Sequence, residues 1–215
     1  MKKPRVLMAD DHSMILAGLR KLVEAEYEVV DTVEDGRALV AAAQKLRPDL
    51  ILLDISMPLL NGLEAARQLH SLAPECKLIF LTMHASPTYA TEAFQAGASG
   101  YLLKRSAVSE LSLAIKSVLQ GQHYLTPSLT KDVLAVAFKP STGERGKIAS
   151  TALTARQREV LQLVSEGLGT KEIATILKIS VKTVEFHKFR LMQQLDIHTT
   201  ADLTKYAITH GITGL

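Results

Sequence analysis

Apolar runs of strand length alternate with helical repeats through the first 121 residues, and this alternation leaves few possible architectures. The runs occupy five segments: Arg5–Ala9, Val29–Val33, Leu50–Leu53, Leu78–Leu81 and Tyr101–Leu103. Apolar residues recur at helical spacing after each run, and a proline or glycine ends each of the last four repeats, at Pro48, Pro74, Gly97 and Gly121. Continuous apolar strands separated by helices are typical of a parallel sheet covered on both faces. We therefore predict a doubly wound α/β fold with five parallel strands.

The pattern changes after Gly121, where the strand-like runs end. Thr126 and Pro127 suit the N-cap and first residue of a short helix. Residues 139–147 are polar and rich in helix breakers, which is typical of a mobile linker. From Thr154 onward only helical repeats occur: Ala155–Glu166, Lys171–Leu177, Val181–Leu195 and Ala201–His210. We predict a first domain at 1–122, a linker with a short helix at 123–149, and an all-α domain at 150–215.

Charge divides the chain in the same way. Residues 1–125 carry 13 Lys and Arg against 14 Asp and Glu, whereas residues 126–215 carry 12 against 8. The basic second part favours a polyanionic partner. The single cysteine, Cys76, indicates a reducing compartment, and no apolar run reaches the ~18 residues of a membrane span. We expect a cytoplasmic protein with no signal peptide and no membrane partner.

Polar residues stand at the ends of four predicted strands. The first strand is followed by Asp10 and Asp11, the third by Asp54 and the fourth by Thr82, and Lys104 ends the fifth. Open parallel sheets bind their ligands at these carboxyl ends. In the flavodoxin-like strand order 2-1-3-4-5 the first and third strands are neighbours, so we expect the three aspartates to converge.

Three converging carboxylates repel one another, and a hard divalent cation such as Mg²⁺ removes this conflict. Mg²⁺ needs only one or two carboxylates and a backbone carbonyl, which leaves one oxygen of Asp54 free to attack phosphorus. Lys104 supplies a point charge for one phosphoryl oxygen, and Thr82 supplies a hydroxyl donor for another. The residues therefore indicate formation of an aspartyl phosphate.

The same residues resemble the receiver domain of bacterial two-component response regulators over about residues 4–122. The shared motifs are Asp10-Asp11, Leu53-Asp54-Ile-Ser-Met-Pro58 with Asn61-Gly62, Thr82, and Gly100-Tyr101-Leu-Leu-Lys104. The resemblance implies that Asp54 accepts a phosphoryl group from a sensor histidine kinase. It implies a Mg²⁺ site made by Asp11, Asp54 and the Ser56 carbonyl with help from Asp10, and phosphoryl contacts from Thr82 and Lys104. Arg105 departs from the family, because many receivers have proline there.

Tyr101 occupies the family's rotamer-switch position. A phosphoryl group adds roughly two negative charges and three acceptor oxygens. We expect these to draw Thr82 inward and to leave space for Tyr101 to turn in. We expect the surface around Ser86–Phe94 to change conformation as a result and to transmit the phosphorylation signal to the rest of the chain.

A helix-turn-helix pattern lies in the basic part, at Thr170–Leu177, Lys178–Ser180 and Val181–Leu195. On the wheel of the last segment, Val184, Leu191 and Leu195 share one side, and Lys182, Phe186, Phe189 and Gln193 share the other. A second helix with an exposed basic N-terminal half is what enters a major groove. We expect Lys182, Lys188 and Arg190 to meet phosphates and the outer face, flanked by Thr183, to meet base edges. Glu185 is either an acceptor for cytosine N4 or a solvated carboxylate.

This segment resembles the LuxR-type output domain of the NarL/FixJ response-regulator subfamily over about residues 150–213. The matching residues are Leu153-Thr-Ala-Arg-Gln-Arg-Glu159, Lys171-Glu-Ile-Ala174, Ser180-Val-Lys-Thr-Val184 and His187. The resemblance implies a homodimer on a double-stranded DNA operator with two half-sites. Gly169-Thr170, Gln194 and Thr200 depart from the family's usual residues, which weakens the expectation of phosphate contacts near the end of the recognition helix.

Phe186 and Phe189 leave three interpretations open. They are tucked against a neighbouring element, they touch thymine methyl groups, or the receiver covers them until it is phosphorylated.

Other classes of protein fit the sequence less well. A haloacid-dehalogenase-type enzyme also uses an Asp nucleophile and Mg²⁺, but it needs an acid/base carboxylate where this chain has Ser56. A dinucleotide-binding enzyme needs a glycine-rich turn where this chain has Asp10-Asp11-His12. A helical module that binds protein instead of DNA remains an alternative for the second domain. We therefore expect a phosphorylation-controlled transcription factor and not an enzyme.

Overall fold

The computed structural model describes residues 3–137 and 153–213. By their contacts the residues form two compact units, Met1–Lys139 and Pro140–Leu215, which we describe separately. The predicted mobile linker at 139–147 lies outside the described residues. No helix of the described ranges has both the length and the apolar character that crossing a membrane requires.

The first unit is built on a parallel sheet. Its strands are β1 (Arg5–Ala9), β2 (Glu28–Val33), β3 (Leu50–Leu53), β4 (Lys77–Thr82), β5 (Gly100–Leu103) and the short β6 (Tyr124–Leu125). They lie in the order β2-β1-β3-β4-β5-β6. The first five strands confirm the predicted doubly wound fold and its 2-1-3-4-5 order. The register pairs Ala9 with Leu53, so the residues that follow β1 and β3 emerge side by side.

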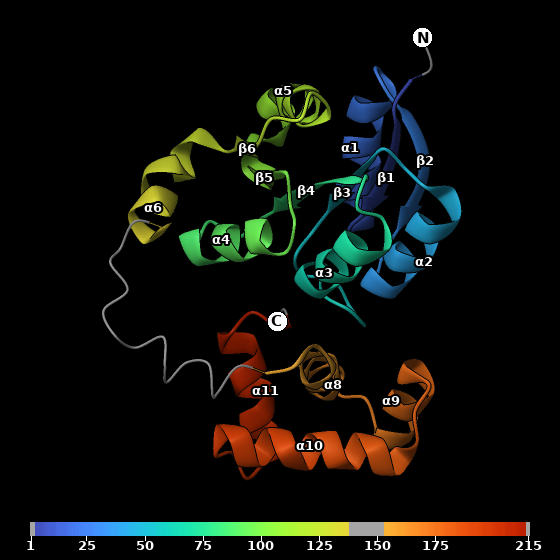
Figure 1. The fold of residues 1–215 in the computed structure, drawn as a ribbon, viewed down its shortest axis with the longest axis vertical. Helices are drawn as coiled ribbons and strands as arrows, with labels where there is room; N and C mark the ends of the chain where they lie inside the picture. Colours follow the sequence, from blue (N-terminus) through green and yellow to red (C-terminus); the bar gives the residue numbers. More distant parts are fainter. Residues whose placement is uncertain (1–2, 138–152, 214–215) are drawn as a thin grey trace. The chain divides into compact units, whose positions relative to one another are not determined.

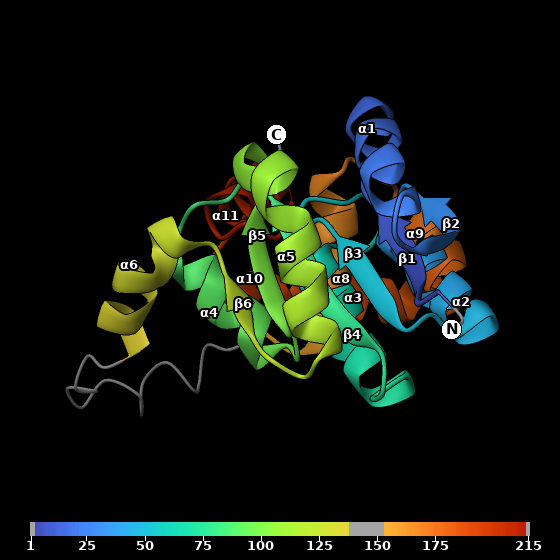
Figure 2. The ribbon, with the colours of Figure 1, turned by 90° about the horizontal axis from the view of Figure 1, so that it is seen from above.

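Helices cover both faces of this sheet, because alternate strand residues point to opposite sides. Helices α2 (Gly36–Leu46), α3 (Gly62–Leu72) and α4 (Pro87–Gln95) pack on the face that carries Leu7, Ile51 and Phe80. Helices α1 (Ser13–Glu24) and α5 (Ala107–Leu119) pack on the face that carries Met8, Leu52 and Ile79. Figures 1 and 2 show the two helical layers on either side of the sheet. A short 3₁₀ turn, Lys104–Ser106, joins β5 to α5.

Two elements that follow α5 belong to the first unit, although we assigned their residues to the linker. Strand β6 extends the sheet beside β5, pairing Gly100 with Tyr124 and Tyr101 with Leu125. The buried Thr126 hydroxyl accepts a hydrogen bond from the Leu103 amide at 3.0 Å. Helix α6 (Pro127–Ala137) begins at the predicted proline and packs against α4, with Leu129 buried in the core. Part of the α4 surface that we expected to present the phosphorylation signal is therefore covered by the chain's own α6.

The second unit is helical, as predicted. It consists of α8 (Ala155–Ser165), α9 (Thr170–Leu177), α10 (Val181–Leu195) and α11 (Thr200–Thr209), with α8 in contact with the other three. Its core includes Val160, Leu163, Ile173, Leu191 and Leu203. Two interactions hold the ends of α9 and α10 to α8. The Arg156 guanidinium donates to the Leu177 carbonyl, and the Gln157 amide donates to the Gln194 side chain, each at 2.9 Å.

Candidate functional site

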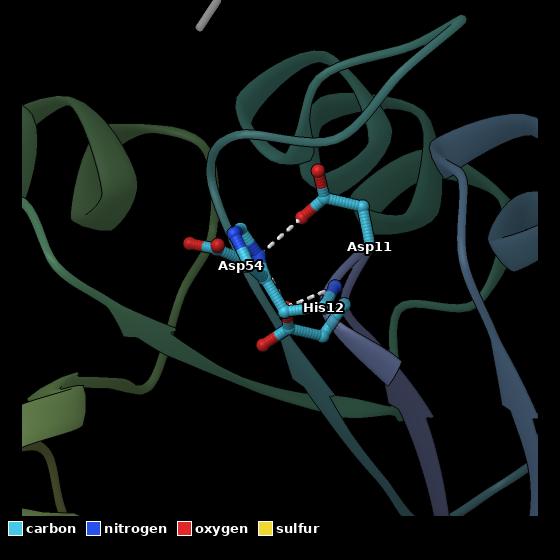
Figure 3. A group of neighbouring side chains, drawn as sticks. Asp11, His12 and Asp54 are labelled. Carbon is cyan, nitrogen blue, oxygen red and sulfur yellow. Dashed lines mark hydrogen bonds and ion pairs between the residues drawn. The ribbon is translucent and has the colours of Figure 1, made fainter. Parts of the chain in front are cut away.

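The ends of β1 and β3 bring the acidic residues together. Ligand atoms of Asp10, Asp11, His12 and Asp54 all lie within 4.8 Å of one another. Figure 3 shows the labelled Asp11, His12 and Asp54 gathered where the two strands end. Asp10 and Asp54 are buried, whereas the Asp11 side chain is 36% exposed. The sequence predicted this convergence, because the strand order makes β1 and β3 neighbours.

Lys104 completes this acidic pocket from the end of β5. Its ammonium group lies 2.7 Å from Asp10 Oδ2 and 2.7 Å from Asp54 Oδ2, and its side chain is only 5% exposed. Burial alone would lower the pKa of Lys104, but the charges and hydrogen bonds of Asp54 and Asp10 outweigh it and raise this pKa above its usual value. The lysine is therefore a permanent cation at neutral pH.

The loop after β3 fixes the Asp54 side chain. Asp54 Oδ1 accepts the Ile55 amide at 2.6 Å, and Oδ2 accepts from Lys104. The loop folds back so closely that a Cβ atom at Gly62 would lie 1.9 Å from the Asp54 carbonyl oxygen, which explains the glycine. Asn61 caps α3 by accepting the Glu64 amide at 2.9 Å. The Asn61-Gly62 pair thus shapes the loop that holds the carboxylate.

Thr82 and Tyr101 lie on neighbouring strands close to Asp54, and both are fully buried. The Thr82 hydroxyl accepts the His84 amide at 3.3 Å, and the Tyr101 hydroxyl donates to the His84 carbonyl at 2.7 Å. Burial raises the pKa of Tyr101, and the Asp54 charge adds to this effect. We expected Tyr101 to turn inward on phosphorylation, and the structure holds its ring in the inward position through the bond to His84.

The donor set of the pocket suits a hard divalent cation. Three of its four candidate ligand residues are carboxylates, which are the oxygen ligands that Mg²⁺ prefers. The exposed side of Asp11 leaves access for the water molecules that Mg²⁺ retains. The acidic pocket is thus consistent with a divalent metal site.

A second group of candidate residues lies on α10, the second helix of the helix-turn-helix. Ser180 caps this helix by accepting the Thr183 amide at 3.1 Å, as the sequence predicted. Lys182, Glu185, Phe186, Phe189 and Arg190 are exposed, whereas Thr183 and Lys188 are half-buried. The Lys188 ammonium donates to the Thr200 hydroxyl at 3.0 Å, which leaves two of its donors for a phosphate oxygen. The opposite side of the helix buries Val184 and Leu191.

Comparison with known proteins matches both units. Residues 6–116 match the family described as the response regulator receiver domain, and residues 151–207 match the bacterial regulatory proteins of the luxR family. The transcriptional regulatory protein MctR of Rhizobium johnstonii is 34% identical over 212 residues, which cover 98% of this chain and 95% of MctR. The chain belongs to the LuxR-type response regulators. Proteins of this class are transcriptional regulators and not enzymes, as we predicted.

Solved structures resemble this response regulator along most of its length. One shows RcsB of Salmonella enterica bound to a promoter in the presence of the phosphomimetic BeF₃⁻; it is 28% identical and covers 99% of this chain and 100% of its own, with a TM-score of 0.58. Another shows two RcsB dimers on two parallel DNAs, at 27% identity and a TM-score of 0.58, covering 95% of this chain and 98% of its own. The regulator therefore joins a phospho-receiver to a LuxR-type domain that binds DNA and controls transcription.

Two histidines of the response regulator were not predicted as parts of the pocket. His12 Nδ1 lies 2.8 Å from Asp11 Oδ1 and 3.2 Å from Asp10 Oδ1. His84 Nε2 lies 2.9 Å from the Ser56 hydroxyl oxygen, and its ring packs 4.5 Å from that of Tyr89. His12 directly follows the two aspartates in the sequence, which is a usable signal. His84 had no such signal, because its contact with Ser56 joins loops 28 residues apart.

Proposed function

We propose that Asp54 is the residue that receives the phosphoryl group. Its carboxylate lies at the end of β3 within the acidic pocket and contacts Lys104, as that of Asp10 does from the end of β1. An Asp54 oxygen attacks the phosphorus of a phosphohistidine on the sensor kinase, and a P–O bond forms as the P–N bond breaks. The departing histidine nitrogen keeps the electron pair of that bond and takes up a proton. The single observation that carries this role is the position of Asp54 in the acidic pocket, in contact with Lys104, within a stretch that matches the receiver family.

Mg²⁺ is the proposed cation of the pocket, held by Asp10, Asp11, Asp54 and the Ser56 backbone carbonyl. When bound, Mg²⁺ neutralises the negative charge that the carboxylates and the phosphoryl oxygens bring together. Lys104 contributes its fixed positive charge to one phosphoryl oxygen, and the Thr82 hydroxyl donates to another. The resulting bonds favour the inward arrangement of Thr82 and Tyr101, and Tyr101 serves as the switch residue.

The proposed DNA contacts belong to α10. The cations Lys182, Lys188 and Arg190 meet phosphates, and Thr183, Glu185, Phe186 and Phe189 lie toward the base edges. We propose a homodimer that binds a double-stranded operator with two half-sites, supported by the RcsB dimers seen on DNA. We propose that the protein is cytoplasmic, because its proposed DNA operator and kinase partner would meet it there. The proposed functional parts are a receiver at 1–122, a linker region at 123–149 whose first elements, β6 and α6, pack on the receiver, and a DNA-binding domain at 150–215.

Substitution of Asp54 tests the acceptor. We expect the wild-type protein to become labelled by a small-molecule phosphodonor with Mg²⁺, and Asp54→Asn to show no stable labelling, because an amide cannot form the acyl phosphate. Asp31→Asn, at an exposed position on β2, is the matched control and should label like the wild type. Undiminished labelling of Asp54→Asn would exclude Asp54 as the acceptor.

A further inference from the structure

Phe186 and Phe189 lie on the outer face of α10 and are not part of the core of the second unit. The Phe186 side chain is 54% exposed and that of Phe189 is 57% exposed. Val184 and Leu191, on the same helix, are 1% and 0% exposed and complete the core without them. Of the three interpretations of this pair, packing against a neighbouring element of the same unit is therefore wrong.

Charged side chains surround the two rings. The guanidinium carbon of Arg190 lies 5.5 Å from the centre of the Phe186 ring, in cation–π contact. Lys182 is exposed one helical turn before Phe186, and Glu185 is exposed beside it. The face is thus an apolar centre flanked by two cations and by the single carboxylate of Glu185. A purely apolar partner would leave Lys182 and Arg190 without a counter-charge, whereas a polyanion with an apolar group at its centre satisfies both.

DNA offers one such apolar group to a helix in the major groove. Base edges there present hydrogen-bond donors and acceptors, and thymine alone adds a methyl group. A phenylalanine ring can make no hydrogen bond, so any base that it favours must be favoured through apolar contact. The phosphates on either side of the groove supply the counter-charges for the cations.

Helix geometry fixes how far apart the contacted bases can be. Phe186 and Phe189 are three residues apart, which is about 4.5 Å along the helix axis at 1.5 Å per residue. The rise between base pairs is about 3.4 Å. Rings at this separation reach neighbouring base pairs and not bases half a helical turn apart.

We propose that Phe186 and Phe189 determine sequence specificity by contacting the methyl groups of thymines on neighbouring base pairs in each operator half-site. This inference rests on the proposed binding of DNA by α10 and adds the base class that this chain selects. Phe186 and Phe189 each account for one of the two methyl groups.

Removal of the methyl groups from the DNA tests the proposal directly. Full-length wild-type protein, treated with phosphodonor and Mg²⁺, first selects duplexes from a random pool. The selected duplexes are then made with deoxyuridine in place of thymine, which removes only the 5-methyl groups. We expect wild-type affinity to fall about fourfold for each contacted methyl, as expected when one buried carbon is lost, and hence about 15-fold for both.

The protein variants assign the effect to the rings. Phe186→Ala should lose its sensitivity to deoxyuridine at one thymine, and Phe189→Ala at the neighbouring one. Both positions are exposed, so neither change should disturb folding, and circular dichroism checks this. Lys182→Ala is the matched control on the same face: it should weaken binding to both duplexes and keep the ratio between them.

The outcomes separate this proposal from the function on which it rests. If the wild type binds thymine and deoxyuridine duplexes with equal affinity, the proposed methyl contacts are wrong, but the proposed DNA binding by α10 is unaffected. If no duplex is selected even at low salt, the proposed DNA binding by α10 is wrong, and the methyl contacts are wrong with it. If the phenylalanine variants bind more tightly than the wild type without phosphodonor and keep the deoxyuridine ratio, the rings are covered by the receiver, and the proposal is wrong.

Discussion

Lys104 joins two buried carboxylates that belong to different strands. Removal of one partner from a buried ion pair leaves an uncompensated charge in the interior. The free-energy cost of that charge is much larger than the net stabilisation that the intact pair provides. Because Lys104 faces both Asp10 and Asp54 at 2.7 Å, its loss leaves two such charges. The residue therefore has a structural role in addition to its proposed contact with the phosphoryl group.

Lys104→Met keeps most of the side-chain volume and removes the charge. We expect it to lower the free energy of unfolding of the receiver by about 3 kcal/mol. Urea denaturation followed by circular dichroism measures this, since the chain has no tryptophan. Lys116→Met is the control, because its pair with Glu26 is solvent-exposed and its loss should leave the midpoint unchanged. Equal midpoints for the two variants would contradict the structural role of Lys104.

Tyr124 gives the first unit a pH dependence at alkaline pH. Its hydroxyl donates to Glu110 at 2.9 Å, and burial together with this bond raises the pKa of Tyr124 to about 12. The neutral phenol is thus favoured in the folded state, so its stabilisation is complete below pH 10 and disappears as the pH rises toward 12. We expect the melting temperature of Tyr124→Phe to lie below that of the wild type at pH 8 and the difference to close by pH 12. A difference that does not change with pH would contradict the hydrogen bond.

Among the elements, those with contiguous apolar runs were the predictable ones. Strands β1 and β3 were predicted to the residue, because each has four successive apolar side chains between polar residues, a pattern that favours a strand buried on both faces of a sheet. Strand β6 was missed, since two residues carry no periodicity. Its position depends on the edge of β5, which is formed by residues more than 20 positions earlier.

Helix α6 is anchored in the receiver core by the buried Leu129, and the partly buried Val133 packs against the same cluster. Leu129 is 3% exposed and belongs to the same cluster as Ala90 and Ala93 of α4. We expect Leu129→Ala to destabilise the first unit by about 3 kcal/mol through lost burial and the cavity left behind. Leu134→Ala, on the same helix at 48% exposure, is the matched control and should have little effect in the same denaturation experiment. If the two variants unfold alike, α6 does not belong to the receiver core.

The candidate pocket was predictable to the extent that it depends on strand ends. Asp10, Asp11 and Asp54 directly follow strands whose order was predictable, so their convergence followed. The bonds from Tyr101 to His84 and from Ser56 to His84 were not predictable, because they depend on how two loops fold over the strand ends. The exposure of Phe186 and Phe189 likewise needed the packing of α10 on α8, which the helical wheel alone leaves undecided.

Over the whole molecule, the two units differ in charge and in function. The near-neutral receiver brings three of its acids together in one pocket, and the basic second part carries exposed cations on α10. Phosphorylation replaces the single negative charge of the Asp54 carboxylate by the roughly two of the phosphoryl group, so the pocket gains about one negative charge and new acceptor oxygens. The central claim of this account is that this change at Asp54 controls the affinity of the helical unit for DNA.

The most direct test of this claim is the affinity of the full-length protein for its selected duplex, with and without phosphodonor and Mg²⁺. For the wild type we predict a change of at least fivefold, the lower end of typical coupling between two sites. For Asp54→Asn we predict the same affinity under both conditions. The account would be contradicted if the wild-type affinity were the same with and without the phosphodonor, or if the affinity of Asp54→Asn changed as much as that of the wild type.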